Sequence, residues 1–367
     1  MTSSAATMLE GLAVRSVRCP ICLDTFDWPS GDVLYHYEER GGRQPLAMPL
    51  GIDELKRRDI LRTAELRCPN PSRDTPAHFL PVSYASYAEP LVVGLVGETE
   101  SGKSHLLAAM IAQIQRGGLQ PYGLKVDPVD IGQHEDYLRD RVEPLILRGE
   151  KIPGTGEDVT SYADALLITS AAGTRPVAFF DVAGGNLVKT GQPSRFLAGV
   201  GALIFVVDPG TALQQRGLGD RSAPREAVRS RDPAFDVVLS RLGAGAQYLD
   251  VPAAVVLNKA DRLRFQSPVD FWMRRPGNGG RIDSRRLREE SRDVYALLYE
   301  HNAHAWLRPF HECRRCTLHF ASATGGEPDG DRYPRGVRPW RVLDPLVALL
   351  AMTGVIPGSE SAAVGVL

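Results

Sequence analysis

The chain has 367 residues, of which 43% are hydrophobic and 24% are charged, and its formal net charge is −1. This length allows one large core plus a small second module, and the near-neutral charge predicts no general attraction to nucleic acid or to anionic membranes. Residues 1–14 lack the basic start and apolar core of a secretory signal, and no stretch approaches the length of an apolar membrane span. We therefore expect a cytoplasmic protein without a membrane span, for which nucleic acid is not an expected partner.

The first candidate site lies near the N-terminus, at a pair of cysteines. Cys19-Pro20-Ile21-Cys22 has the spacing of half a zinc knuckle, because two thiolates at this separation can hold one face of a tetrahedral ion. Cys68 and His78 would complete a Cys₃His set, although the nine residues between them are more than the usual spacing. The sequence therefore predicts a Zn²⁺ site formed by Cys19, Cys22, Cys68 and His78.

Two alternatives to this zinc site stay open. Cys19 and Cys22 could pair instead with Cys313 and Cys316, which have the same spacing and would join the N-terminal segment to the main domain. All five cysteines could also be reduced thiols without a metal. Their odd number, in a chain without a secretory signal, argues against a disulfide framework.

The segment around these cysteines is expected to be a small zinc-ribbon-like module over residues 1–85. Its predicted elements are two strands of a β-ribbon and a short polar helix, at 32–37, 45–48 and 52–63. A module of about 80 residues with so little apolar content gains much of its stability from a bound metal. Prolines and small residues over 81–90 predict a short linker to a main domain that spans 88–357.

A glycine-rich loop, G-E-T-E-S-G-K-S, opens the main domain and matches the phosphate-loop pattern G-x-x-x-x-G-K-S. A buried strand is predicted over 91–96 and a helix over 104–115, which is the context that this motif requires. Backbone N–H groups of such a loop converge on the β-phosphate, Lys103 reaches the β- and γ-phosphates, and Ser104 ligates Mg²⁺. The residues expected to contact the nucleotide here are Gly97, Glu98, Glu100, Ser101, Gly102, Lys103, Ser104 and His105.

A second motif is suited to reading the base. Asn258-Lys259-Ala260-Asp261 reads N-K-x-D and follows a predicted strand at 251–257, at the strand end where α/β sheets bind ligands. A carboxylate at Asp261 accepts hydrogen bonds from N1–H and N2–H₂ of guanine, whereas adenine has no donors there. Asn258 is expected to tie this loop to the phosphate loop, and the stem of Lys259 to cover one face of the base.

Two shorter motifs fit the same chemistry. Ser322-Ala323-Thr324 follows a predicted strand at 318–321 and matches the S-A-x segment whose alanine N–H faces guanine O6. Asp181-Val182-Ala183-Gly184 follows a predicted strand at 176–180 and reads D-x-x-G. In that motif the aspartate acts on Mg²⁺ through water, and the glycine amide contacts the γ-phosphate.

A threonine that reaches Mg²⁺ and the γ-phosphate is expected in a loop before the predicted strand 165–169. Thr155 is favoured because it lies in a glycine-rich loop, and Thr160 is the alternative nearer the strand. The residue after the D-x-x-G glycine is Gly185, where related proteins often carry a glutamine that orients the attacking water. Glycine offers only its amide, so slow intrinsic hydrolysis is predicted.

The remaining predicted elements connect these motifs. They are an extra element at 134–147, a strand at 202–207, a polar insertion at 211–232, helices at 284–307 and 343–352, and a flexible tail at 358–367. Arginines are frequent over 262–292 but are interleaved with acidic residues, which favours a solvated surface there.

With its motifs in this order, the sequence resembles the Ras-like, translation-factor-related (TRAFAC) class of P-loop GTPases, from about residue 90 to the C-terminus. Within that class it resembles a bacterial group in which the GTPase domain follows a cysteine-containing, zinc-ribbon-like segment. The resemblance implies an α/β domain with a mostly parallel six-stranded sheet flanked by helices, and a cycle between GTP- and GDP-bound states. It also implies that Lys103, Thr155 and Gly184 act on the γ-phosphate and that Ser104, Thr155 and Asp181 serve Mg²⁺.

The function predicted from these residues is a regulatory GTPase that binds GTP, GDP and Mg²⁺ and responds to a protein effector or regulator. An alternative is a zinc-containing scaffold or adaptor whose GTP-binding domain does not hydrolyse GTP, which Gly185 would suit. A further alternative, an ATPase or kinase, is disfavoured by the N-K-x-D motif.

Overall fold

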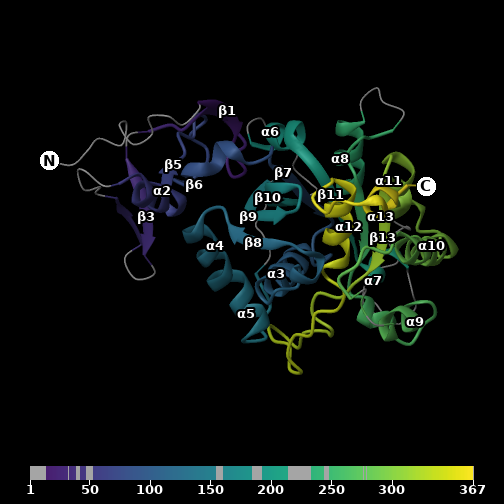
Figure 1. The fold of residues 1–367 in the computed structure, drawn as a ribbon. Coiled ribbons are helices and arrows are strands. Elements are labelled where there is room, and N and C mark those ends of the chain that lie inside the picture. Colours follow the sequence, from purple (N-terminus) through teal and green to yellow (C-terminus); the bar gives the residue numbers. More distant parts are fainter. Residues whose placement is uncertain are drawn as a thin grey trace.

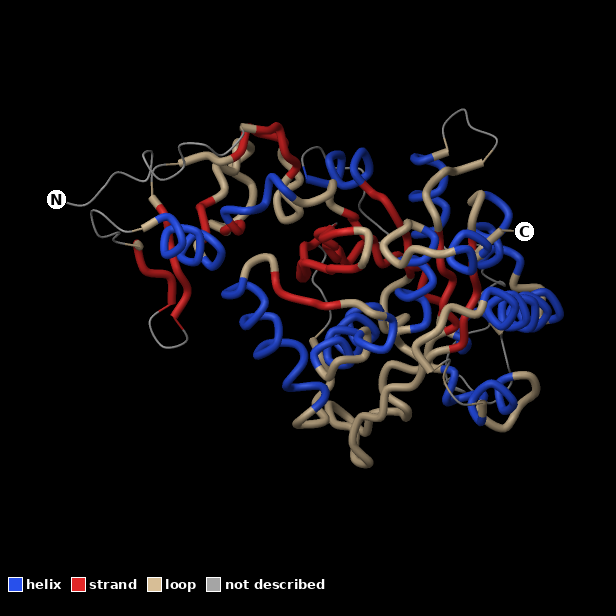
Figure 2. The backbone as a smooth tube through the Cα atoms, viewed as in Figure 1, coloured by secondary structure: helices blue, strands red, loops and turns tan. Residues whose placement is uncertain are grey.

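The computed structural model describes residues 14–31, 33–38, 42–46, 53–153, 160–183, 192–213, 233–243, 248–275, 277 and 279–366. A central sheet with helices on both of its faces forms the larger part, and a module with two small sheets lies at one end (Figure 1). Figure 2 shows the same division, with the strands of the central sheet in the interior.

The central sheet has seven strands in the order β13-β12-β11-β7-β10-β9-β8. Their bounds are β7 Leu91–Gly97, β8 Lys125–Pro128, β9 Thr160–Ser170, β10 Gly173–Ala183, β11 Val200–Val207, β12 Ala253–Leu257 and β13 Cys316–Phe320. The strands from β13 to β10 run parallel, whereas β9 is antiparallel to both β10 and β8. The expected α/β class with a mostly parallel sheet is confirmed. The expected count of six strands is wrong, because the short strand β8, which lacks an apolar run, pairs with β9 at the edge.

Both faces of the sheet are covered by helices of the main domain. The helices of this domain are α3 Lys103–Gln115, α4 Ile131–Tyr137, α5 Glu143–Ile146, α6 Gln192–Gly199, α7 Pro209–Ala212, α8 Pro233–Leu242, α9 Val269–Arg274, α10 Ser284–Glu300, α11 Arg308–Glu312, α12 Asp344–Met352 and α13 Ser359–Ala363. In the central strand β7, Leu91, Val93 and Leu95 belong to the core with α3 and α12, while Val92 and Val96 belong to the core with α6 and α8. Successive side chains of a strand point to opposite faces, so this uninterrupted apolar run is buried on both sides.

The N-terminal module combines a hairpin with a second small sheet. The hairpin pairs β1 Arg15–Arg18 with β2 Thr25–Trp28, and the sheet has the order β4-β3-β5-β6, with β3 Leu34–Glu38, β4 Gly42–Pro45, β5 Glu65–Arg67 and β6 Phe79–Pro81. Helix α2 spans Glu54–Thr63, and the carboxylate of Asp53 caps it by accepting from the Lys56 N–H. The predicted ribbon and polar helix are therefore present, although the second ribbon strand lies three residues earlier than expected.

Three connecting segments can be compared with the elements that the sequence predicts for them. The extra element expected at 134–147 is present as α4, a π-helical turn at Leu138–Val142 and α5. The helix expected over 284–307 ends earlier, at Glu300, because Asn302 takes a left-handed backbone conformation (φ 56°) and a separate turn at His304–Leu307 follows. Of the polar insertion expected at 211–232, residues 214–232 lie outside the described part of the chain.

The segment after Gly358 packs against the sheet, contrary to the flexible tail expected there. Val364 is fully buried, and the Gly365 carbonyl accepts a hydrogen bond from the N–H of Cys316 at the start of β13. The guanidinium of Arg315 donates to the carbonyls of Met352, Ser361 and Val364 at 2.6–3.0 Å. The sequence did not reveal this packing, because it depends on contacts with residues distant in the chain, among them Arg315, Cys316 and Ser284.

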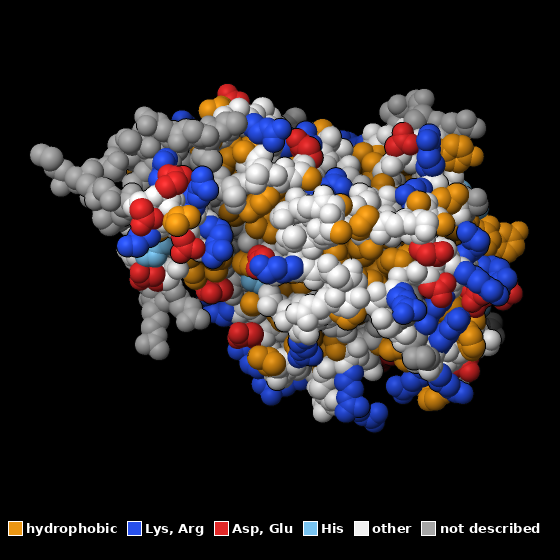
Figure 3. All heavy atoms as spheres, viewed as in Figure 1, with side chains coloured by type: hydrophobic (Ala, Val, Ile, Leu, Met, Phe, Trp, Pro, Cys, Tyr) orange, Lys and Arg blue, Asp and Glu red, His pale blue; other side chains and the backbone are white. Residues whose placement is uncertain are grey.

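The surface carries both signs of charge. On the face drawn in Figure 3, Lys and Arg side chains alternate with Asp and Glu side chains over the N-terminal module and over the opposite end of the molecule. Among the described residues, no helix has the length and apolar character needed to cross a membrane.

Candidate functional site

The loop between β7 and α3 curls tightly around its two glycines. Gly97 ends β7, and a Cβ atom added to it would lie 2.5 Å from the carbonyl oxygen of Val206. Gly102 has φ +89°, and a Cβ atom added there would lie 2.6 Å from the Asn258 side-chain nitrogen. Both positions therefore require glycine, one for close approach of two strands and the other for backbone conformation as well.

The charged and hydroxyl groups of this loop contact one another at the end of β7. The ammonium of Lys103 donates to the carbonyls of Gly97 and Glu98, at 2.9 and 3.0 Å. The hydroxyl of Ser104 donates to Asp181 Oδ2 at 2.7 Å, so the phosphate-loop helix and the end of β10 meet here. Lys103 and Asp181 are both buried, so neither charged group is freely exposed to solvent.

Two buried oxygen atoms of the same loop region have no hydrogen-bond partner among the described residues. They are Asp181 Oδ1 and the hydroxyl oxygen of Ser101. A buried polar atom without a partner is costly, so such atoms call for a ligand, an ion or water. Together with Ser104, the Asp181 carboxylate offers the hard oxygen ligands that Mg²⁺ takes, and the residues therefore fit this ion.

The two segments that the sequence predicts to read the base converge on this loop. The side-chain amide of Asn258 donates to the Ser101 carbonyl at 3.0 Å, and its oxygen accepts from the Ala323 N–H at 3.2 Å. Ser322 donates from its hydroxyl to Asp261 Oδ1 at 2.5 Å and accepts from the Gly325 N–H. The structure thus brings together the three segments that the sequence placed at separate strand ends.

Lys259 is held across the loop by a partner that the sequence analysis missed. Its backbone is left-handed (φ 53°), and its ammonium donates to the Glu100 carbonyl at 2.8 Å and to Asp208 Oδ2 at 2.5 Å. Asp208 directly follows β11 and caps α7 by accepting from the Gly210 N–H. Its position at a strand end before Pro209 was the available signal.

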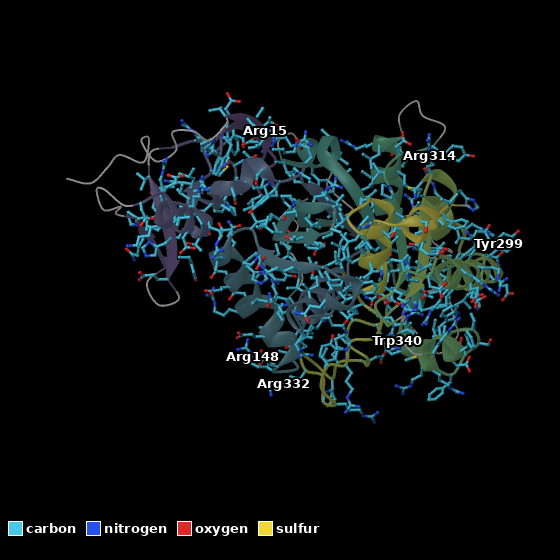
Figure 4. All side chains as sticks on the ribbon, in the orientation of Figure 1. Arg15, Arg148, Tyr299, Arg314, Arg332 and Trp340 are labelled. Atoms are coloured by element: carbon cyan, nitrogen blue, oxygen red, sulfur yellow. The ribbon has the colours of Figure 1, made fainter. Side chains whose placement is uncertain are left out.

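A second missed feature is the segment after Ser322-Ala323-Thr324, which crosses to residues 149–151. The Lys151 N–H donates to the Asp331 carbonyl at 2.8 Å, and the Tyr333 N–H donates to Gly149 at 2.7 Å. Arg148 and Arg332, neighbours in Figure 4, both pair with Glu150. Long-range pairing of two irregular segments leaves no periodic pattern in a sequence.

His105 lies under this crossing. Its Nε2 accepts from the Ile152 N–H at 3.3 Å, and its ring meets that of Tyr333 edge-on, with 6.2 Å between centroids. Burial lowers the pKa of His105 to about 4, and the nearby Lys151 and Lys259 act in the same direction. The ring is therefore neutral at pH 7 and serves as an acceptor.

The residues expected to contact the γ-phosphate, a threonine (Thr155 or Thr160) and Gly184, are only partly within the described residues. Thr155 and Gly184, with Gly185 after it, lie outside the described residues, so their roles stay predictions. Thr160 is the first residue of β9 and is in register with Val182, which places it in the sheet rather than in the loop before it.

A cluster of potential metal ligands lies in the N-terminal module. It consists of Cys19, Cys22, Cys68 and His78, whose ligand atoms all lie within 4.8 Å of one another and which are all buried. Cys19 Sγ lies 3.2 Å from His78 Nε2, and Cys22 Sγ lies 3.8 Å from Cys68 Sγ. Three thiols and one imidazole at these distances fit a closed tetrahedral Zn²⁺ site.

Hydrogen bonds around the cluster set the tautomer of His78 and shift the pKa values of the cysteines. His78 Nδ1 must donate its proton to the Pro76 carbonyl, 2.8 Å away, which leaves Nε2 as the free lone pair facing the thiols. Hydrogen bonds from Cys19 and Cys22 lower the pKa of Cys68 to about 5, whereas burial raises that of Cys19. Metal binding requires deprotonated cysteines, and the lowered pKa of Cys68 favours the thiolate there.

The rival ligand set with Cys313 and Cys316 is wrong for the described residues. Both are buried free thiols in the main domain and do not belong to the cluster. Burial raises the pKa of Cys313 to about 12, with Glu312 adding to the shift. A neutral thiol in that setting acts as an apolar core side chain.

Comparison with known proteins gave likenesses among solved structures only. No family model matches the sequence, and no curated protein matches it. Among solved structures, the crystal structure of the bacterial selenocysteine-specific elongation factor EF-Sec is similar, with 14% identity and a TM-score of 0.28. The likeness covers 64% of this chain and 26% of that chain, so this protein spans about a quarter of its length. A TM-score of this size is too low to define a shared fold.

Proposed function

We propose that this protein is a Mg²⁺-dependent GTP-binding protein and GTPase that acts as a regulatory switch. The observation that carries the proposal is the position of Asn258, which is hydrogen-bonded to Ser101 in the phosphate loop and to Ala323 in the S-A-x segment. One side chain therefore joins the segment suited to phosphate with the two segments suited to guanine. A chance glycine-rich turn would not be tied to a base-reading loop in this way.

Base selection falls to Asp261. Its Oδ1 accepts from Ser322, which fixes the carboxylate, and the carboxylate then accepts from N1–H and N2–H₂ of guanine. The Ala323 N–H donates to Asn258 Oδ1 in this structure and would share or exchange that hydrogen bond to donate to guanine O6. Adenine would leave the carboxylate without donors and is rejected.

Phosphate binding falls to the loop backbone, Lys103 and Ser104. Lys103 exchanges its bonds to the Gly97 and Glu98 carbonyls for the β- and γ-phosphate oxygens, and Ser104, Thr155 and Asp181 hold Mg²⁺. When bound, the ion neutralises charge that develops on the phosphates during hydrolysis. Gly184 would contact the γ-phosphate through its amide.

Hydrolysis without a partner should be slow. Gly185 has no side chain to orient water, so a protein regulator that supplies a group in trans would accelerate turnover by about 10³–10⁵. A scaffold that binds GTP without hydrolysing it is the second candidate, and Gly185 is the observation in its favour. The Cys₃His cluster would hold a structural Zn²⁺, because four protein ligands leave no open coordination position.

The Asp261→Asn variant tests this proposal. Asparagine can still accept from Ser322 but presents a donor to guanine, so GDP affinity should fall by about 10²–10⁴-fold, as expected for two charge-assisted hydrogen bonds. Xanthosine diphosphate, which carries an oxygen in place of the N2 amine, should bind the variant better than GDP. Asp270→Asn, a change on the surface helix α9, is the control and should leave both affinities unchanged. Equal loss for both nucleotides would contradict base reading by Asp261.

A further inference from the structure

The turns that carry the metal ligands are the same turns that hold the N-terminal module against the main domain. Asp24 lies two residues after Cys22, and its Oδ1 is 3.4 Å from Arg195 of α6. Arg195 also pairs with Asp74, six residues after Cys68. One arginine of α6 thus contacts two of the metal-ligand turns.

These two turns are also joined to each other. Ser72 donates from its N–H and from its hydroxyl to Asp24 Oδ2, at 3.0 and 2.6 Å. The same hydroxyl lies 2.8 Å from the Asp74 carboxylate. The positions of the Asp24 and Asp74 carboxylates, which pair with Arg195, therefore depend on how the Cys22 and Cys68 turns lie relative to each other. An ion bound by both cysteines would fix that arrangement.

The third turn, at His78, contacts α4. The N–H of Phe79 donates to Asp130 Oδ2 at 2.9 Å, and Asp130 caps α4 by accepting from the Gln133 N–H. The guanidinium of Arg43 lies 4.1 Å from the centre of the Phe79 ring and pairs with Asp130. In Figure 1 the module accordingly lies beside both α4 and α6.

Both helices lead to the proposed nucleotide site. In α6, Phe196 packs on Phe180, with 5.6 Å between ring centroids, and Phe180 directly precedes Asp181. In α4, the buried His134 contacts Asp164 of β9 at 2.7 Å through Nδ1 and Gln115 of α3 at 2.5 Å through Nε2. The helix α3 runs from Lys103 to Gln115, so His134 contacts its C-terminal end, whereas Lys103 and Ser104 lie at its N-terminal end.

We propose that Zn²⁺ at the Cys₃His cluster and guanine nucleotide at the phosphate loop bind with positive coupling, through the contacts of the module with α6 and α4. With metal bound, the three turns would be ordered, and they would hold α6 and α4 in place next to the strand of Asp181 and to α3. The nucleotide would then have less conformational freedom to remove when it binds, so its affinity would rise. The inference rests on the proposed function, because it requires that the loop binds guanine nucleotide. The module would then act as a metal-dependent regulator built into the chain.

The coupling is measurable in the full chain from the metal side. The apparent Zn²⁺ affinity is determined by competition with a chromogenic chelator, with and without saturating GDP and Mg²⁺. We expect GDP to tighten Zn²⁺ binding at least about fivefold, the lower end of the range for coupled sites. By linkage, the zinc-loaded protein should bind GDP more tightly than the zinc-depleted protein by the same factor.

Arg195→Gln isolates the α6 contact while keeping all four metal ligands. It removes the pairs with Asp24 and Asp74 and is expected to lower the coupling factor, with Zn²⁺ still bound. Arg308→Gln is the matched control, because Arg308 also pairs with two carboxylates, Asp236 and Glu312, but away from the module. It should leave the coupling factor unchanged.

The outcomes separate this inference from the proposed function. Independent binding of Zn²⁺ and GDP in the wild type would overturn the coupling alone, and a coupling factor that Arg195→Gln leaves unchanged would overturn the route through Arg195 of α6. A chain that binds Zn²⁺ but no guanine nucleotide would overturn both.

Discussion

The side-chain amide of Asn258 lies 3.0 Å from the carbonyl oxygen of Ser101, so the loop after β12 is fastened to the loop after β7. The Asn258 oxygen accepts from the Ala323 N–H after β13, which extends the connection to a third strand. Because parallel strands end at one edge of the sheet, residues far apart in sequence meet there. Asn258 thus fixes how far the proposed base-binding segments lie from the proposed phosphate loop.

Asn258→Ala tests this connection. The change leaves the Ser101 carbonyl and the Ala323 N–H buried without this partner, which costs about 1–3 kcal/mol for each group. We expect GDP affinity to fall by about 10²-fold, while the cooperative thermal transition remains. Isothermal titration of variant and wild type with GDP in Mg²⁺ measures the change. Unaltered affinity would mean that the loops hold their spacing without this side chain.

Gly102→Ala tests the shape of the phosphate loop. An alanine there adopts an unfavourable positive φ and places its Cβ against the Asn258 amide, so the loop must shift and nucleotide binding should be lost. Gly354→Ala is the control, since Gly354 also has a positive φ (+76°) but has open space around it. The control should lose about 1–2 kcal/mol of stability and keep its GDP affinity. Equal GDP affinity in the two variants would contradict the predicted collision.

Metal content distinguishes the two cysteine sets. We expect the purified protein to contain one Zn²⁺ per chain by elemental analysis, and Cys68→Ser to lose it because a closed tetrahedral site needs all four ligands. Cys313→Ser should retain the metal, since Cys313 lies outside the cluster. Metal in the first variant but not in the second would restore the rival set.

Glu290 is predicted to hold the end of β13. It is fully buried, its Oε1 accepts from the Phe320 N–H at 2.9 Å, and its Oε2 pairs with Arg341 at 2.6 Å. Glu290→Gln should lower the free energy of unfolding by about 1.5–3 kcal/mol, because it removes one of the two carboxylate partners of the buried Arg341 and leaves only Asp344. Glu289→Gln, at a half-buried position of the same helix where the carboxylate pairs with Arg275 and Arg285, should change stability by less than about 1 kcal/mol. Urea denaturation of both variants provides the comparison.

The same carboxylate predicts a pH dependence. Burial raises the pKa of Glu290, but Arg341 and His319 outweigh it and hold the pKa below its ordinary value. The stabilisation is therefore fully present above the unfolded-state pKa and is lost as the pH falls through the lower folded-state pKa. We expect Glu290→Gln to lose less stability than the wild type between pH 5 and pH 3, a window that spans the ordinary glutamate pKa of about 4.3. A parallel loss in both proteins would contradict the predicted shift.

Local patterns in the sequence were enough for the strands and loops that carry the site. The apolar runs before Gly97, Asp181 and Asn258 are β7, β10 and β12, and the Cys₃His set was found despite its unusual spacing. Long-range pairing was not visible: Asp208 beneath Lys259 and the tail held by Arg315 depend on contacts between distant segments. Strand β8 was missed because four residues with a single branched apolar side chain carry too weak a pattern.

The most direct test of the central claim is titration of the purified full chain with GTP, GDP and ATP in Mg²⁺, followed by GTP turnover on the same sample. Tight binding of GTP and GDP, no competition by ATP, and very slow turnover are the predicted results. Binding of ATP as tightly as GTP would contradict base reading by Asp261, and absence of nucleotide binding would contradict the account as a whole.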